Sequence, residues 1–266
     1  MKTIVIAIAN QKGGVGKSTT AAALATELAI REFETLLIDA DPQSNATQIF
    51  LAPEMVQTSL ADVLIGAGAS IAEKRVTTEI EHLDLVPATL SLANFDREPA
   101  LSVTKLRAAL RDLGDSYDFI IIDTPPNLGL LLTTALAAAT HVLIPVQAAP
   151  FALTGLQDLL RVVQDARELN EGLAVLGAVC TLYDTRTSVS GASFRTLTEM
   201  MPGQTFETMI HRQTKLEEAP SMHQPIQLYA PTSRGAEQYS ALTEEVLSKL
   251  GVSGKSSKLS VVKGAK

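Results

Sequence analysis

A glycine-rich segment near the N-terminus carries the residue types that bind a phosphate group. It runs Lys12-Gly-Gly-Val-Gly-Lys-Ser-Thr19 and directly follows an apolar stretch, residues 4–9. Backbone N–H groups of such a turn converge on an anion, and the N-terminus of the next helix adds partial positive charge. Lys17 would contact the β- and γ-phosphates, and the Ser18 hydroxyl would bind Mg²⁺. The remaining nucleotide-binding residues expected in this loop are Gly13, Gly14, Val15, Gly16 and Thr19.

The segment departs from the usual phosphate-loop pattern G-x-x-x-x-G-K-[ST] at one position. Gln11 stands where the first glycine should be, and a second lysine, Lys12, follows it. Because Lys17 already serves its own phosphate, Lys12 has two interpretations. It is either an ordinary surface charge or a group that reaches a nucleotide on a facing copy of the chain, where it would neutralise charge as an arginine finger does.

Two acidic segments add the remaining chemistry. Asp123 ends the apolar run 119–122, where a carboxylate can hold a Mg²⁺-bound water opposite the phosphate loop. Asp39 and Asp41 follow the run 35–38, so that one can support the metal shell while the other orients or deprotonates water. Taken alone, these residues also fit strand-end caps and turns. Together with the glycine-rich loop, they predict one phosphate-transfer site.

The elements that must position these residues alternate along the chain between strand-like and helix-like patterns. Continuous apolar strands separated by helices predict an α/β fold with a mostly parallel, twisted sheet and helices on both faces. Ligands of such sheets bind beyond the carboxyl ends of the strands. Strands are expected at residues 4–9, 35–38, 83–86, 119–122, 142–146 and 175–181, and helices at 17–31, 60–64, 99–113, 130–139, 153–170, 192–200 and 232–250.

Composition narrows the class of protein. The 266 residues are 46% hydrophobic, yet no apolar run reaches the roughly 18 to 20 residues that a membrane-spanning helix needs. The first residues lack the charged, apolar and cleavage regions of a signal peptide. Cys180 is the one cysteine, which excludes an internal disulfide framework and a multi-cysteine cluster within one chain. These observations predict a cytoplasmic protein.

Charge is distributed unevenly. The formal net charge is −7, while residues 251–266 hold four lysines and no acid, which leaves −11 on residues 1–250. The overall field is therefore unfavourable for nucleic acid, and any DNA contact must come from local basic patches. We expect residues 1–250 to form one domain and the Gly/Ser/Lys-rich residues 251–266 to be a disordered tail.

These motifs resemble those of ParA-type partition ATPases, in the deviant Walker A (MinD/ParA) group of P-loop ATPases. The resemblance spans about residues 1–250. Its specific motifs are Lys12–Thr19, Asp39-Ala-Asp-Pro-Gln-Ser-Asn-Ala-Thr47 and Phe119-Ile-Ile-Ile-Asp-Thr-Pro-Pro126. Similar pieces follow at Tyr183–Arg186, Glu218–Ser221 and Ser233–Tyr239.

The resemblance implies an ATP-sandwich homodimer with ATP and Mg²⁺ as cofactors. Lys12 matches the signature lysine that reaches the partner's phosphates, and Asp41 matches the hydrolysis aspartate. Asp123 matches the Walker B aspartate, which acts on Mg²⁺ through water, and Ser18 matches the Mg²⁺ ligand. Hydrolysis should then depend on dimerisation. The catalytic residues would be Lys12, Lys17 and Asp41, with Asp39 a further candidate for the metal shell.

The resemblance also implies that the ATP-bound dimer binds DNA without sequence preference, through basic residues of its C-terminal half. Lys215 replaces an arginine of the family pattern and keeps its charge, while His211 replaces a proline. Arg212 matches an arginine that lies close to the adenine in related proteins, so it is a candidate for both nucleotide and DNA. Arg186 and Arg195 are further DNA candidates. A ParB-like adaptor that stimulates hydrolysis and a nucleoid-associated location are expected as well.

Three alternatives stay open within the same group of ATPases. A MinD-like membrane ATPase would need an amphipathic C-terminal helix, for which the tail offers only Leu259, Val261 and Val262. A ParA-like ATPase that positions a protein assembly has the same chemistry with a different cargo. A nitrogenase-reductase-like electron carrier would need two cysteines per chain for its bridging cluster, and Cys180 is expected to be a small buried hydrophobe instead.

Overall fold

The computed structural model describes residues 2–66, 69–97, 103–149 and 154–253. Within these ranges the chain forms an eight-stranded sheet in the order β3-β4-β2-β5-β1-β6-β7-β8. All neighbouring strands are parallel except β3, which pairs antiparallel with β4 at the edge. The strands are β1 (Ile4–Ile8), β2 (Thr35–Asp39), β3 (Val76–Thr77), β4 (Leu83–Val86), β5 (Phe119–Asp123), β6 (His141–Gln147), β7 (Ala174–Tyr183) and β8 (Thr205–His211).

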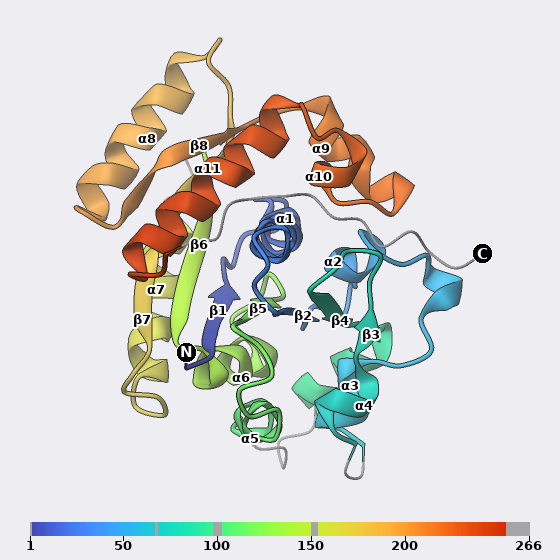
Figure 1. The fold of residues 1–266 in the computed structure, drawn as a ribbon. Coiled ribbons are helices and arrows are strands. Elements are labelled where there is room, and N and C mark those ends of the chain that lie inside the picture. Colours follow the sequence, from blue (N-terminus) through green and yellow to red (C-terminus); the bar gives the residue numbers. More distant parts are fainter. Residues whose placement is uncertain (1, 67–68, 98–102, 150–153, 254–266) are drawn as a thin grey trace.

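Helices cover both faces of the sheet (Figure 1). They are α1 (Lys17–Ile30), α2 (Asn45–Gln48), α3 (Leu60–Leu64), α4 (Ile71–Lys74), α5 (Lys105–Arg111), α6 (Leu130–Ala138), α7 (Thr154–Ala166), α8 (Ser188–Met200), α9 (Thr214–Glu218), α10 (Ile226–Tyr229) and α11 (Arg234–Lys249). Short 3₁₀ segments lie at Pro53–Met55, Leu90–Arg97 and Ala219–Met222. Among the described residues, no helix is both long and apolar enough to cross a bilayer.

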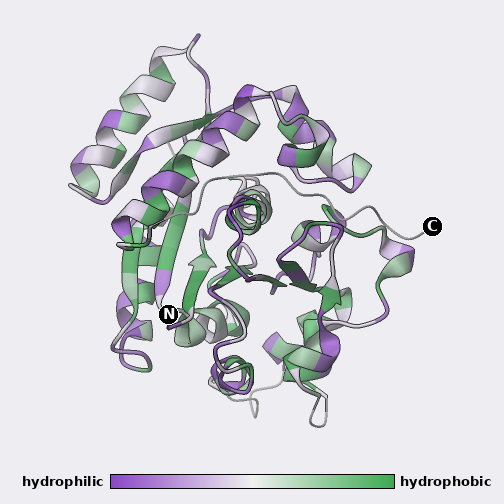
Figure 2. Cartoon of the chain, viewed as in Figure 1, coloured by the Kyte–Doolittle hydropathy of each residue, from purple (hydrophilic) through white to green (hydrophobic). Residues whose placement is uncertain are grey.

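Two apolar cores lie on the opposite faces of the sheet. One packs α1, α2, α10 and α11 against one face, and the other packs α3, α5, α6, α7 and α8 against the other. Strands β1, β2 and β5 are buried along almost their whole length, and in Figure 2 the strands β1, β6 and β7 are coloured as hydrophobic. Burial on both faces explains why these strands read as continuous apolar runs. The fold therefore confirms the predicted α/β class.

The register of the central strands brings the acidic residues together. Asp123 at the end of β5 lies beside Asp39 of β2 on one side and beside Ile8 of β1 on the other. The phosphate loop leaves β1 at the same level. The carboxyl ends of the neighbouring parallel strands β2, β5 and β1 therefore lie at one edge of the sheet, as expected from the sequence.

Several element boundaries differ from the sequence expectations. The helix expected at 99–113 runs only from Lys105 to Arg111, where a turn leads to Gly114 in the left-handed region at φ +57°. The helix expected to reach residue 170 ends at Ala166, and the Asn170 amide group donates instead to two carbonyls at the end of α6. Residues 98–102 and 150–153, and the tail from residue 254, lie outside the described ranges.

The strand β8 has no counterpart among the elements expected from the sequence, and neither do β3, α2, α4, α9 and α10. The omission of β8 matters because this strand ends next to the basic residues singled out as DNA candidates. Its sequence, Thr-Phe-Glu-Thr-Met-Ile-His, has only weak alternation of polar and apolar residues. Pairing with β7 at the edge of the sheet, rather than its own pattern, makes this segment a strand.

Candidate active site

The glycine-rich loop has the backbone geometry of an anion cradle. Gly14 and Gly16 have φ of +71° and +83°, a region that favours glycine. Gly16 is the residue that caps α1, and no side chain caps the first turn of this helix or places an acid there. The first N–H groups of α1 are therefore free to bind a phosphate oxygen.

Two side chains that the sequence analysis overlooked hold this loop in place. The buried Asn10 amide donates to the Pro145 carbonyl at 2.7 Å, and its oxygen accepts the N–H of Lys12 at 2.9 Å. The Thr181 hydroxyl at the end of β7 donates to the Val15 carbonyl at 2.8 Å. The sequence could have pointed to Asn10, because it is a polar residue directly before the loop. It could not have pointed to Thr181, because only the fold brings Thr181 close to Val15.

The two lysines of the loop have different environments. Lys17 is buried, and its Nζ donates to the Lys12 carbonyl at 3.2 Å. Burial lowers the pKa of Lys17, while the carboxylates of Asp123 and Asp41 oppose that shift. Lys12 is partly exposed, and within the described ranges no carboxylate forms an ion pair with it. Lys17 is thus buried beside the loop of its own subunit, and no described carboxylate compensates the Lys12 charge.

Asp123 is a fully buried carboxylate that has no hydrogen-bond partner among the described residues for either oxygen. Burial, followed by the neighbouring Asp39 carboxylate, raises the pKa of Asp123 well above its usual range. The nearby Ser18 hydroxyl opposes that shift without reaching hydrogen-bonding geometry. A buried polar group normally has a partner, so the unpaired Asp123 carboxylate points to a ligand that supplies one.

The geometry fits Mg²⁺ bound together with a nucleotide. Mg²⁺ keeps several waters and is usually held by one or two protein groups plus substrate phosphates. Ser18 and Asp123 supply one hydroxyl and one carboxylate beside the loop. In the part of the chain that the structure describes, no cluster of three or more His, Cys, Asp or Glu could hold a metal by itself. The metal would therefore depend on the phosphates for the rest of its ligands.

The two carboxylates of the acidic loop after β2, Asp39 and Asp41, have different environments. Asp39 is fully buried and accepts three hydrogen bonds: the Asp41 N–H at 3.0 Å, and the N–H and hydroxyl of Thr47, both at 2.7 Å. Burial raises the pKa of Asp39 to about 6 in spite of these donors. Asp41 instead lines a cleft that begins at the phosphate loop, and its carboxylate accepts the Gln43 N–H at 2.9 Å. The arrangement favours Asp39 as a residue that positions the loop and Asp41 as the one that faces the substrate.

A cleft of about 730 Å³ extends from the phosphate loop to the C-terminal elements. The loop and Asp41 line one end, while Arg212 and the segment around Pro220 line the other. Arg212 therefore lies where a base or sugar would sit if the phosphates occupied the loop. Its guanidinium is exposed and pairs with Glu217 at 3.3 Å.

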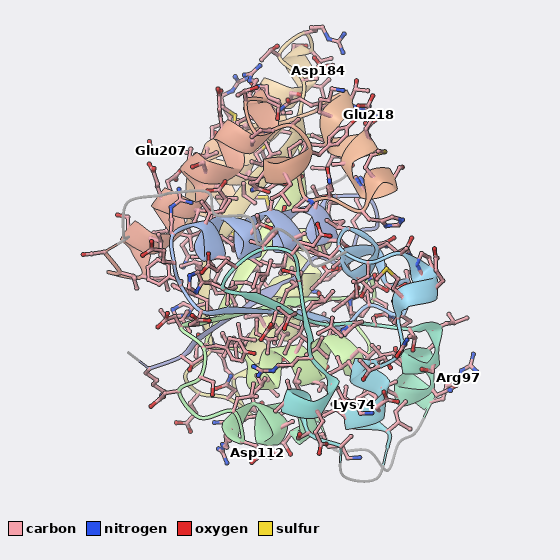
Figure 3. All side chains as sticks on the ribbon, turned by 45° about the vertical axis from the view of Figure 1, so that its right-hand side comes forward. Lys74, Arg97, Asp112, Asp184, Glu207 and Glu218 are labelled. Atoms are coloured by element: carbon pink, nitrogen blue, oxygen red, sulfur yellow. The ribbon has the colours of Figure 1, made fainter. Side chains whose placement is uncertain are left out.

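The other basic candidates lie away from this cleft and differ in their partners. Arg186 forms two contacts with Asp184, at 2.9 and 2.7 Å, and Lys215 pairs with Glu218 at 2.8 Å. Arg195 is exposed on α8 and makes no ion pair with any described residue. Figure 3 places Asp184 and Glu218 at the end of the molecule that the C-terminal elements form, opposite Asp112.

Comparison with known proteins decides the family. Residues 3–175 match the family model described as an AAA domain. The chain is 41% identical over 247 residues to the sporulation initiation inhibitor protein Soj of Bacillus subtilis, covering 91% of this chain and 97% of that protein. It is 40% identical over 248 residues to the chromosome partitioning protein ParA of Myxococcus xanthus, covering 91% and 87%.

The chain belongs to the ParA/Soj family of partition ATPases. Among solved structures, it is similar to cobyrinic acid a,c-diamide synthase from Mycobacterium smegmatis with bound ADP and magnesium, with a TM-score of 0.80 and 31% identity over 94% of this chain and 96% of that one.

In this ParA/Soj protein, Cys180 is buried in β7, and burial raises the pKa of its thiol to about 12. The thiol is thus the inert, small hydrophobe that its strand position predicted.

Proposed function

We propose that this ParA/Soj ATPase dimerises around ATP and Mg²⁺, binds DNA without sequence preference in that state, and releases it after hydrolysis. Its cargo would be a chromosome or plasmid, and a ParB-like adaptor would stimulate hydrolysis. The observation that carries the proposal is the contrast between the two lysines of the loop. Lys17 is buried against its own site, whereas Lys12 has no acidic partner within the described residues.

The geometry of the site supports a separate role for each of its groups. The loop amides and Lys17 hold the phosphates, and Asp41 lies in the cleft where it can orient an attacking water. Mg²⁺ supplies charge neutralisation on the β- and γ-phosphates when it is bound. The Lys12 ammonium of the facing subunit adds the charge that one chain lacks, so that a monomer has an incomplete site. ATP would then hold two subunits together, and hydrolysis would weaken that contact.

The proposed DNA contact rests on Lys215, Arg195, Arg186 and Arg212. Three of them are paired with acids, in exposed ion pairs that typically contribute 0–1 kcal/mol. A phosphate can therefore compete for them, and binding should be weak, salt-sensitive and independent of sequence. A dimer doubles these contacts, which would make DNA binding depend on ATP.

The test compares wild type with the Lys12→Ala and Lys215→Ala variants, using Lys2→Ala as a control on an exposed residue outside the site. We expect ATP hydrolysis per subunit to rise with protein concentration, and Lys12→Ala to abolish both hydrolysis and the ATP-dependent dimer seen by light scattering. A DNA gel shift should appear with ATP but not with ADP, and Lys215→Ala should weaken it. Full ATPase activity in Lys12→Ala would exclude the proposed dimer chemistry.

A further inference from the structure

A second cleft lies beside the nucleotide cleft, where β7 and β8 end. It encloses about 390 Å³. The loop after β7, the start of α9 and the first residue of α11 line it, and three arginines reach it: Arg186, Arg212 and Arg234. Arg212, Gln213 and Glu217 line both clefts and form the wall between them. The second cleft is therefore a basic site that adjoins the nucleotide.

The charges in this cleft leave one guanidinium uncompensated. Asp184 pairs with Arg186, and Glu217 pairs with Arg212, so those four charges cancel. Arg234 forms no ion pair with a described carboxylate; its Nη2 donates to His211 Nε2 at 2.7 Å. Burial and the adjacent Arg234 lower the pKa of His211, which favours the neutral ring that accepts this hydrogen bond. The cleft thus has a net charge of about +1, centred on Arg234.

The surrounding backbone adds to this charge. Arg234 is the first residue of the 16-residue helix α11, whose N-terminus carries partial positive charge. The acidic side chain of that first turn, Glu237, lines a different cleft. Thr185 and Thr214 also line the basic cleft, and a threonine hydroxyl is a neutral group that can donate to an anion. The donors and the charge together suit an oxygen-rich anion.

We propose that this cleft binds a backbone phosphate of DNA, with Arg234 as the main contact, an inference that rests on the DNA binding proposed above. Guanidinium groups bind phosphate oxygens bidentately. A phosphodiester carries a single negative charge, which matches the single uncompensated arginine. A free phosphate ion, with its higher charge, would need to displace Asp184 or Glu217 as well. Arg234 is thus a DNA-binding residue in addition to those expected from the sequence.

The test measures binding of a labelled DNA duplex to the full chain with ATP and Mg²⁺, over a series of salt concentrations. We compare wild type with Arg234→Gln, and with Arg161→Gln as a control that removes one exposed arginine of α7. Arg234→Gln should weaken binding about tenfold at low salt and reduce the slope of log K against log salt by about 1 per subunit. Arg161→Gln should match wild type.

A further variant, His211→Gln, separates a direct contact from a structural role, because it removes the neighbour of Arg234 and keeps the charge. We expect His211→Gln to retain the wild-type salt slope. If it lost as much affinity and slope as Arg234→Gln does, with the Arg234 charge still present, a direct contact between Arg234 and DNA would be overturned. Wild-type affinity and slope in Arg234→Gln would overturn the inference and leave the proposed function intact. A wild-type protein that binds no DNA would overturn both. Displacement of the duplex by inorganic phosphate at matched ionic strength would assign the cleft to free phosphate instead.

Discussion

The Thr47 hydroxyl helps to fix the position of the acidic loop after β2, residues 39–47. It donates to Asp39 Oδ2 at 2.7 Å and accepts the Ala88 N–H at 2.9 Å, with all three groups buried. Valine has nearly the same shape, so Thr47→Val removes both hydrogen bonds without leaving a large cavity. Losing a hydrogen bond to a charged group costs about 1.5–3 kcal/mol, and leaving a buried N–H unpaired costs about 1–3 kcal/mol. We expect the free energy of unfolding to fall by about 3 kcal/mol.

A matched control exists within the same chain. Thr26 is fully buried in α1, and its hydroxyl has no hydrogen-bond partner among the described residues. Thr26→Val therefore removes the same atom without breaking a hydrogen bond, and we expect it to be neutral or stabilising by about 1 kcal/mol. Urea denaturation of both variants, without nucleotide, gives the two free energies on one scale.

The Thr47→Val variant should also hydrolyse ATP more slowly, because Asp39 positions Asp41 through the Asp41 N–H. We expect the loss to appear in kcat more than in nucleotide affinity, since the phosphate loop is held by other residues. The reasoning would be refuted if Thr47→Val lowered the free energy of unfolding by less than about 1 kcal/mol, or if Thr26→Val lowered it equally. In either case the hydrogen-bond partners of a buried hydroxyl would not determine how much it contributes to stability.

Two further substitutions test the loop and the core separately. Asn10→Ala removes the two hydrogen bonds that tie the phosphate loop to Pro145 and leaves the Thr181 contact in place, so we expect a loss of about 2 kcal/mol of stability and weaker binding of a fluorescent ATP analogue; unchanged affinity would show that Asn10 does not hold the loop. Glu27→Ala removes the buried carboxylate partner of the Arg31 guanidinium and leaves only the exposed Glu244 carboxylate, 3.8 Å away, which should cost about 3 kcal/mol. Glu27 lies ten residues along α1 from Lys17, or about 15 Å, so a large change in ATPase rate with this variant would contradict a purely structural role.

Sequence alone predicted the positions of those candidate site residues that depend on local pattern and on one topological rule. The glycine loop with Lys17 follows a continuous apolar run, and Asp123 ends another, which is the pattern of buried strands. Because such strands are parallel, their carboxyl ends meet at one edge of the sheet. The residues that support them were not predictable in the same way. Thr181 bonds to a carbonyl 166 residues away in the chain, and Asn10 to one 135 residues away. Such contacts depend on strand order, which no local pattern encodes.

The same limit applies to the basic residues, where charge in the sequence differs from charge available to a ligand. Arg186, Arg212 and Lys215 count as three cations in the chain, but each faces a carboxylate in the fold. A phosphate that binds them must first replace that partner, which costs up to about 1 kcal/mol for each exposed pair. Arg195 and Arg234 have no such partner among the described residues, so a phosphate gains their full attraction. The sequence selected Arg186, Arg195 and Arg212 without distinguishing paired from unpaired side chains, and it did not select Arg234. The fold favours Arg234 and Arg195, because the ion pairs that distinguish these arginines form only on folding.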